Sequence, residues 1–270
     1  FDHLRRFQRR ELLRMGGCDL VDLLDLLTVT VQLSNLADCL VQVCLDVAAT
    51  RLSTSAEGFV VLAMGKLGGR ELNYSSDIDL LFLAQDHTVS YQRLGELLIE
   101  GLSKVTGEGF LYRVDMRLRP WGRSGPLVTS TEGYLAYLDR HARLWEKQAM
   151  LKARPIAGSI SLGRDFLERA GDKLFGIRGR EARDAVSAMK ARTEATLRTQ
   201  GGEWGEVKLG RGSIRDVEFT TQFLQMKHGA DDPLIRSPNT LEALQRLRDQ
   251  GYLGAESHRV LTEGYVFLRT

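Results

Sequence analysis

Two carboxylates interrupt a run of residues that is otherwise as apolar as a protein interior. Between 77 and 83 the chain reads Asp-Ile-Asp-Leu-Leu-Phe-Leu, and a short apolar run of this kind is typical of a buried strand. Asp77 and Asp79 are two residues apart, so on a strand both side chains project from one face. A buried carboxylate without compensation is energetically expensive. The sequence therefore predicts a hard divalent cation here, such as Mg²⁺, which binds carboxylates together with phosphate oxygens.

A glycine-rich segment precedes the two acids. It follows a second apolar run, 59–64, and begins Gly-Lys-Leu-Gly-Gly. Glycines let backbone N–H groups approach an anion closely, the lysine adds positive charge, and two serine hydroxyls stand just ahead of the acids. The candidate phosphate-binding residues are therefore Gly65, Lys66, Gly68, Gly69, Ser75 and Ser76.

A third strand is expected over 110–119, where polar and apolar residues alternate until a proline ends the pattern. One face of this strand would carry Arg113, Asp115, Arg117 and Arg119. Asp115 can complete a three-carboxylate metal site of the kind that neutralises a transferring phosphoryl group. The alternative is that Asp115 only pairs with a neighbouring arginine.

Most of the remaining chain has a helical pattern. Apolar residues keep the 3.6-residue period within 1–50, best between Leu33 and Ala48. The other expected helices are 89–106, 131–152, 162–174, 181–199, 212–228, 240–250 and 255–270. We therefore predict an α+β fold with a small mixed-sheet core over 51–155. A helical lead-in over 1–50 would precede this core, and a helical bundle over 156–270 would follow it.

Composition excludes several classes of protein. Lys plus Arg (37) nearly balances Asp plus Glu (35), and no basic stripe with interleaved aromatics exists, so we expect no nucleic-acid partner. No run of about 18 apolar residues is present, so no membrane span is expected. Three cysteines without a CxxC argue against a disulfide scaffold and favour the cytoplasm. The chain lacks an initiator methionine and stops within a helical pattern, so we expect a piece of a longer protein.

The string around the two acids resembles a known family. Gly-Lys, then ten residues, then Asp-h-Asp-h (h, hydrophobic) is similar to the nucleotidyltransferase superfamily typified by DNA polymerase β. The complete string from Gly65 to Leu80 resembles glutamine synthetase adenylyltransferase more closely. So do Arg-Leu-Arg-Pro-x-Gly-x-Ser-Gly from Arg117, Trp-Glu-Lys-Gln-Ala from Trp145, and Lys-Ala-Arg from Lys152. The similarity runs over essentially the whole chain.

That family carries two such domains in one polypeptide. The amino-terminal copy removes AMP from glutamine synthetase, and the carboxy-terminal copy attaches it. Segments 114–127 and 208–219 resemble the removing copy, and the adding copy's Lys-His-x-x-Gly-Gly-x-x-Asp-h-Glu-Phe is absent. Ser213 and Asp216 stand where removing domains more often show Gly and Glu. The resemblance therefore favours the adenylyl-removing half.

The resemblance implies a phosphorolysis, in which inorganic phosphate attacks an adenylylated tyrosine of glutamine synthetase and ADP leaves. Asp77, Asp79 and Asp115 would be the catalytic residues and would hold Mg²⁺. Arg117 and Arg119 would bind the attacking phosphate or the β-phosphate of the product. ADP, ATP and AMP would be the nucleotide ligands, and the PII signal protein the expected regulator.

Segment 205–219 is a second candidate for phosphate or AMP. Lys208, Arg211 and Arg215 surround two glycines just before a helix that should begin near Ser213. A helix N-terminus flanked by basic residues favours an anion. The alternative is a basic turn between two helices.

Two other functions stay open. One is an adenylylating activity that uses ATP, or the activity of a relative such as the uridylyltransferase that modifies the PII protein. The other is a nucleotide- or regulator-sensing module without catalysis, against which the three acids argue.

Overall fold

The structure is a computed structural model that describes residues 1–86, 88–177, 179, 183–184, 187–188, 190–191, 195, 207–208 and 210–270. The chain divides into two compact units. Unit 1 comprises Phe1–Ala142 and Lys152–Ala170, and unit 2 comprises Arg143–Leu151 and Gly171–Thr270. Each unit is described by itself.

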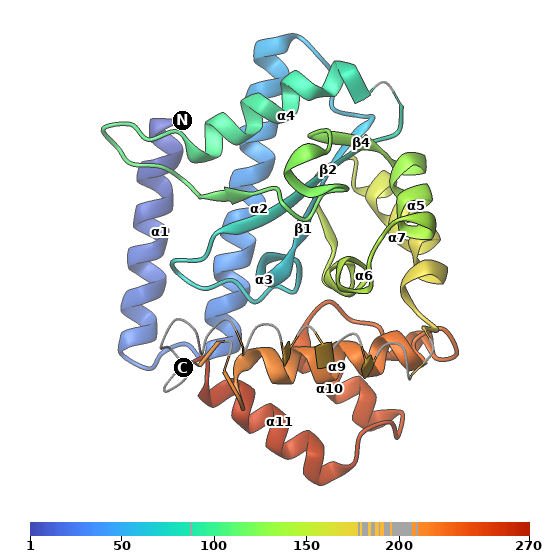
Figure 1. Cartoon of the computed structure of the whole chain (residues 1–270). Helices are drawn as coiled ribbons and strands as arrows, with labels where there is room; N and C mark the ends of the chain where they lie inside the picture. The colour runs from blue at the N-terminus through green and yellow to red at the C-terminus, as the bar shows by residue number, and fades with distance from the viewer. Residues whose placement is uncertain are drawn as a thin grey trace. The chain divides into compact units, whose positions relative to one another are not determined.

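A mixed five-stranded sheet forms the centre of unit 1 (Figure 1). Its strands are β1 (Phe59–Met64), β2 (Ile78–Ala84), β3 (Val114–Asp115), β4 (Val128–Ser130) and β5 (Arg154–Gly158). Strand β1 is antiparallel to both β2 and β5, whereas β2 is parallel to β3 at its start and to β4 at its end. A small mixed sheet among helices confirms the α+β prediction.

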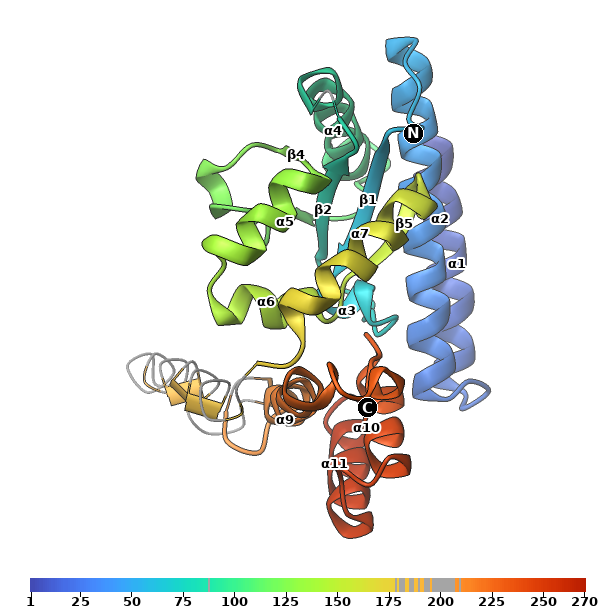
Figure 2. The same cartoon turned by 90° about the vertical axis from the view of Figure 1, so that its right-hand side faces the viewer.

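Helices cover both faces of this sheet. They are α1 (Asp2–Leu20), α2 (Leu26–Leu52), α3 (Gly65–Gly68), α4 (Thr88–Ser103), α5 (Thr131–Arg140) and the first part of α7 (Ile160–Leu174). The face with Val61 and Leu80 shares one hydrophobic core with α2 and α4. On the other face, Gly163 of α7 packs against Val60 and Leu62. Figure 2 shows α2 on one side of the sheet and α5 on the other.

Helix α2 is 27 residues long, and its first turn is capped by Asp25, whose carboxylate accepts a hydrogen bond from the Thr28 N–H at 2.7 Å. The predicted apolar stripe is confirmed, because its eight residues are all buried: Leu33, Leu36, Ala37, Leu40, Val41, Cys44, Leu45 and Ala48. By length and composition alone, α2 is long and apolar enough to cross a membrane, with a mean hydropathy of 1.3 over an 18-residue window. Its stripe packs in the core of unit 1, which accounts for that hydropathy.

The strand expected over 110–119 is wrong except at Val114–Asp115. The Leu111 N–H donates to the Leu102 carbonyl at the end of α4, so the chain enters β3 from a turn. Beyond β3, the Arg119 side chain binds backbone carbonyls and closes a loop. The alternating polarity there belongs to a sequence of turns, so the four predicted residues do not share one strand face.

The single helix expected over 131–152 is two helices, α5 and α6 (Leu144–Met150). The Tyr137 carbonyl accepts the last helical hydrogen bond of α5 from His141, and the Glu146 carboxylate caps the first turn of α6. No glycine or proline lies between the two helices, so the helical periodicity of the sequence predicts one uninterrupted helix.

The described part of unit 2 is helical. It contains α6, α9 (Ile214–His228), α10 (Thr240–Asp249), α11 (Ala255–Phe267) and a short 3₁₀ turn at Pro233–Ile235. Ile214, Val217, Leu244 and Tyr265 form a core between α9, α10 and α11. These elements confirm the helices expected after residue 212, whereas most of the one expected over 181–199 lies outside the described residues. The expected domain boundary between 155 and 156 falls inside β5.

Helix α3 lies so close to the start of β5 that only glycine fits at their contact. A Cβ atom on Gly68 would lie 1.9 Å from the Lys152 carbonyl oxygen and 2.8 Å from the Ala63 carbonyl oxygen. Both neighbours are backbone atoms, which cannot rotate away. Gly68 therefore fixes how closely the glycine-rich segment approaches the sheet.

We expect Gly68→Ala to destabilise the protein by about 1–3 kcal/mol or more, because the backbone must shift to admit a methyl group. Gly17→Ala is the matched control, since Gly17 lies in α1 with nothing within 4 Å of an added Cβ. It should raise stability by about 0.5–1 kcal/mol. Urea unfolding followed by circular dichroism measures both, and equal midpoints for the two variants would contradict the packing argument.

Candidate active site

The register of the sheet brings the predicted acids together. Asp79 of β2 lies directly beside Asp115 of β3, and Asp77 precedes Asp79 by two residues. Leu80, the next residue of β2, belongs to the core with α2, so Asp79 and Asp115 lie on the opposite face. The prediction that Asp115 lies on a strand beside the Asp77/Asp79 pair is confirmed for Asp79, Asp77 lies just before β2, and a metal site formed by all three acids stays a prediction.

The guanidinium of Arg117 binds Asp115, and the charges of all three carboxylates affect its pKa. Its Nε donates to Asp115 Oδ2 at 2.7 Å and to Oδ1 at 3.0 Å. The hydrogen bond and charge of Asp115 raise the pKa of Arg117, and the charges of Asp79 and Asp77 add to this effect. The same hydrogen bond lowers the pKa of Asp115. Arg117 thus supplies positive charge at the place where the sequence predicts a metal ion.

Asp77 has a cationic partner as well. Arg113 donates from Nε to Asp77 Oδ1 at 2.5 Å and from Nη2 to the Ser75 carbonyl at 2.9 Å. The alternative raised for Asp115, that it pairs with an arginine, also describes this structure, with Arg117 as the partner. Asp77 and Asp115 are therefore each neutralised by an arginine, and both arginines lie within two residues of Asp115.

The donor set fits Mg²⁺, which prefers oxygen ligands from a small number of carboxylates. Within the part of the chain that the structure describes, no three Asp, Glu, His or Cys side chains lie close enough to form a finished metal cluster. Two of the acids are bound by arginines, Asp77 by Arg113 and Asp115 by Arg117. Both arginine side chains are well exposed, at 60% and 65%, so they can rotate away at little expense.

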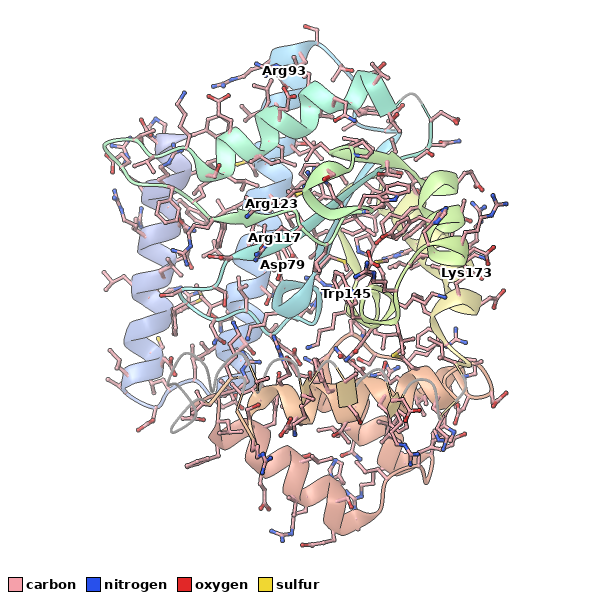
Figure 3. The ribbon with its side chains drawn as sticks, in the orientation of Figure 1. Asp79, Arg93, Arg117, Arg123, Trp145 and Lys173 are labelled. Carbon is pink, nitrogen blue, oxygen red and sulfur yellow. The ribbon has the colours of Figure 1, made fainter. Side chains whose placement is uncertain are left out.

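An open pocket of about 400 Å³ lies beside the acids. Its lining residues are Asp77, Val114, Asp115, Met116, Arg117, Arg119 and Arg123. Figure 3 labels Asp79, Arg117 and Arg123, which lie in this part of unit 1. Sequence reasoning found every charged member of the lining except Arg123, which the failed strand prediction over 110–119 left out.

The predicted phosphate loop is a helical turn, α3, followed by turns and irregular chain up to β2. Gly65 has a positive φ of 55°, and a Cβ atom there would lie 2.5 Å from Asp79 Oδ2. Glycine is therefore needed at this position for the carboxylate to lie against the backbone. Lys66 is half-buried in the same turn, at the end of β1 beside the acids.

The other loop residues differ in exposure. Gly68 and Gly69 are buried, and Gly68 is required by its contact with the Lys152 backbone. Ser75 is exposed and Ser76 half-buried, just before the acids. Close packing thus explains Gly68 without a ligand, whereas a phosphate contact for Ser75 and Ser76 stays a prediction.

Two ion pairs that sequence reasoning missed hold this loop in place. The Lys152 ammonium binds the Glu71 carboxylate, and both side chains are buried. Arg154 forms a bidentate pair with Asp38 of α2, at 2.7 and 3.0 Å, and also donates to the Leu67 carbonyl at 3.0 Å. Helix α2 and strand β5 are thereby tied to α3. The only sequence signal was the family string that contains Lys152 and Arg154.

The predicted basic residues of segment 205–219 belong to unit 2. Lys208 and Arg211 are exposed, and burial lowers the pKa of Arg215, whose guanidinium lies 5.5 Å from the Phe219 ring centre. At the N-terminus of α9, Asp216 Oδ2 accepts from the Gly212 N–H at 2.8 Å.

A second contact of Asp216 bears on the anion prediction. The same oxygen accepts from Lys190 Nζ at 2.8 Å. A carboxylate of the chain thus binds where an anion was expected, and a ligand contact for Lys208, Arg211 and Arg215 stays a prediction.

Comparison with known proteins assigns the chain to a family. Residues 1–169, which include the whole acidic site, match the model of glutamate-ammonia ligase adenylyltransferase. The chain belongs to this family. Residues 180–270 match a second model, that of the PII-uridylyltransferase GlnD.

Three relatives from this adenylyltransferase family carry the same name, bifunctional glutamine synthetase adenylyltransferase/adenylyl-removing enzyme. The protein of Corynebacterium efficiens is 42% identical over 247 residues, which cover 90% of this chain and 23% of the relative. The Hahella chejuensis protein is 38% identical over 98% of this chain and 30% of its own length. The Streptomyces avermitilis protein is 39% identical over 99% and 28%. The chain therefore spans less than a third of the length of these relatives.

We expect Lys152→Met or Glu71→Leu alone to destabilise this family member by about 3–5 kcal/mol, because each leaves a buried charge without its partner. The double variant Glu71→Leu/Lys152→Met should be more stable than either single variant, since no unpaired charge remains at the contact. Urea unfolding of all four proteins measures this double-mutant cycle. Additive losses in the double variant would show that the two side chains are not coupled.

Proposed function

We propose that this chain removes AMP from an adenylylated tyrosine of glutamine synthetase by Mg²⁺-dependent phosphorolysis. The observation that carries the proposal is the register that places Asp79 beside Asp115, two residues after Asp77, next to an open pocket lined by Asp77 and Asp115. Neighbouring carboxylates suit phosphoryl transfer, in which cations must be held against a negatively charged substrate. The names of the relatives include both the adding and the removing activity on glutamine synthetase.

Two segments favour the removing half over the adding half. Residues 114–127 and 208–219 resemble the removing copy, and the second segment lacks the Lys-His string of the adding copy. The first of these segments supplies Asp115 and the arginines of the pocket. The preference for removal therefore rests on residues of the proposed site and on one segment of unit 2.

The proposed reaction balances without a redox partner. An oxygen of inorganic phosphate forms a bond to the α-phosphorus, while the bond from that phosphorus to the tyrosine oxygen breaks. AMP leaves as ADP, and the tyrosine oxygen takes up the proton that the phosphate gives up. A bound Mg²⁺ would neutralise the phosphoryl group and align the entering and leaving oxygens.

The chain's own residues then have distinct tasks. Asp77, Asp79 and Asp115 would hold the metal ion through their oxygens. Lys66 and the backbone of α3 would contact the nucleotide phosphates, because α3 begins beside Asp79. Arg117 would exchange its carboxylate partner for a phosphate oxygen, a contact that suits the planar guanidinium.

A set of parallel assays with the 270-residue chain and Mg²⁺ tests the proposal. One contains adenylylated glutamine synthetase and inorganic phosphate, the second unmodified synthetase and ATP, and the third PII protein and UTP, because of the match to the uridylyltransferase model. We expect ADP release in the first assay only. Asp77→Asn and Asp79→Asn should lower the rate by at least about 100-fold, which is the scale on which loss of one strong electrostatic contact acts.

The other outcomes decide between the alternatives. AMP incorporation in the second assay would assign the adding half, and UMP incorporation in the third would assign the uridylyltransferase activity. Silence in all three, with nucleotide binding retained, would favour a sensing module. Regulation by PII and a cytoplasmic location stay predictions from the sequence.

A further inference from the structure

Three guanidinium groups line the pocket beside the acids, and the structure gives them different environments. Arg117, Arg119 and Arg123 line the pocket together with Asp77 and Asp115. Arg119 and Arg123 belong to residues 116–125, which we call the arginine loop. The hydrogen bonds that each arginine side chain already makes decide whether it is available to bind an anion.

Arg119 is committed to the backbone of its own loop. Its Nε donates to the Gly125 carbonyl at 3.1 Å, Nη1 to the Met116 carbonyl at 2.9 Å, and Nη2 to the Arg123 carbonyl at 3.0 Å. All three guanidinium nitrogens thus hold main-chain acceptors. Turning the group toward a ligand would break these bonds and leave the carbonyls without their partners.

The arginine loop needs this internal support because its backbone is irregular. Trp121 and Gly122 both have a positive φ of 58°. A Cβ atom on Gly125 would lie 1.9 Å from the Pro120 carbonyl oxygen, so the two ends of the turn are in close contact. A few turn hydrogen bonds, such as Gly122 N–H to the Arg119 carbonyl at 2.9 Å, complete the loop. The Arg119 side chain therefore links the parts of the loop that no strand pairing holds.

Arg123 is in the opposite situation. Its side chain is exposed and lines the pocket, and its guanidinium makes no hydrogen bond or ion pair with the described residues. The positive charge of Arg123 contributes to the lowered pKa of Asp115, which lines the same pocket. Arg117 lines the same pocket and is bound to Asp115. Figure 3 shows Arg123 and Arg117 together in the region of Asp79.

We propose that Arg123, together with Arg117, binds the inorganic phosphate that attacks the adenylylated tyrosine, and that Arg119 is a positioning residue that holds the arginine loop. This inference rests on the proposed function and replaces the expectation that Arg117 and Arg119 form the phosphate site. A phosphate ion beside carboxylates needs more than one cation, and two guanidiniums on one pocket wall provide paired N–H donors to its oxygens.

Kinetics with varied phosphate test the assignment. We expect Arg123→Gln to raise KM for inorganic phosphate by about 10- to 100-fold, the effect of one lost hydrogen bond between charged groups. KM for adenylylated synthetase and the Tm should stay unchanged. Arg123→Lys should recover part of the phosphate affinity. Arg93→Gln is the matched control, because Arg93 is exposed on α4, pairs locally with Glu96, and lies away from the pocket (Figure 3).

The positioning role of Arg119 has a different signature. Arg119→Lys should lower the Tm and, at a temperature well below that Tm, also raise KM for phosphate while KM for the protein substrate stays constant. A purely structural role would lower the Tm alone. If Arg119→Lys lost phosphate affinity at unchanged Tm, or if Arg123→Gln left KM for phosphate unchanged, the inference would be overturned.

A binding measurement keeps this inference separate from the proposed function. Isothermal titration of the 270-residue chain with inorganic phosphate and Mg²⁺, without synthetase, compares wild type with Arg123→Gln and Arg93→Gln. If the wild type shows no phosphorolysis but binds phosphate through Arg123, the proposed function fails and the phosphate site stands. Phosphate binding that is equal in all three proteins, or absent from the wild type, rejects the site.

Discussion

The negative charge of Asp79 and Asp115 is the constraint around which unit 1 is arranged. The parallel register of β2 and β3 places these carboxylates side by side, and Asp77 lies two residues before Asp79. Such a group is tolerated only with compensating cations. Arg113 and Arg117 supply them, each from within two residues of Asp115. Strand β3 thus contributes Asp115, and the residues that flank the strand contribute Arg113 and Arg117, which neutralise Asp77 and Asp115.

The helices at the start of the chain belong to the same arrangement, although their sequence shows no sign of it. Asp38 of α2 binds Arg154 at the start of β5, and Arg154 also binds the carbonyls of α3. Ser34 of α2 accepts the N–H of Leu72, and Asp19 of α1 accepts the Tyr74 hydroxyl at 2.9 Å. The lead-in therefore supports the glycine-rich segment from several directions, and its role is to fix that segment against the sheet.

Arginines near the acids have three different roles, and residue type does not separate them. Arg113 neutralises an acid, Arg119 holds a loop, and Arg123 presents its charge to the pocket. The difference comes from the backbone: Arg113 precedes a strand, whereas Arg119 lies inside a turn whose carbonyls surround it. The family string Arg-Leu-Arg-Pro marks the segment as important without saying which arginine meets a ligand.

The sequence by itself determined the elements with strong local patterns and the chemistry of the acids. The 3.6-residue period of α2, the apolar runs of β1 and β2, and the Asp-x-Asp spacing depend only on neighbours along the chain, so they can be read directly. Tertiary structure alone decided the partners. Glu71 and Lys152 are 81 residues apart, Asp38 and Arg154 are 116 apart, and no local rule connects them. It also decided that residues 116–125 form a loop, because hydrogen bonds from one arginine side chain outweigh an alternating pattern that predicts a strand.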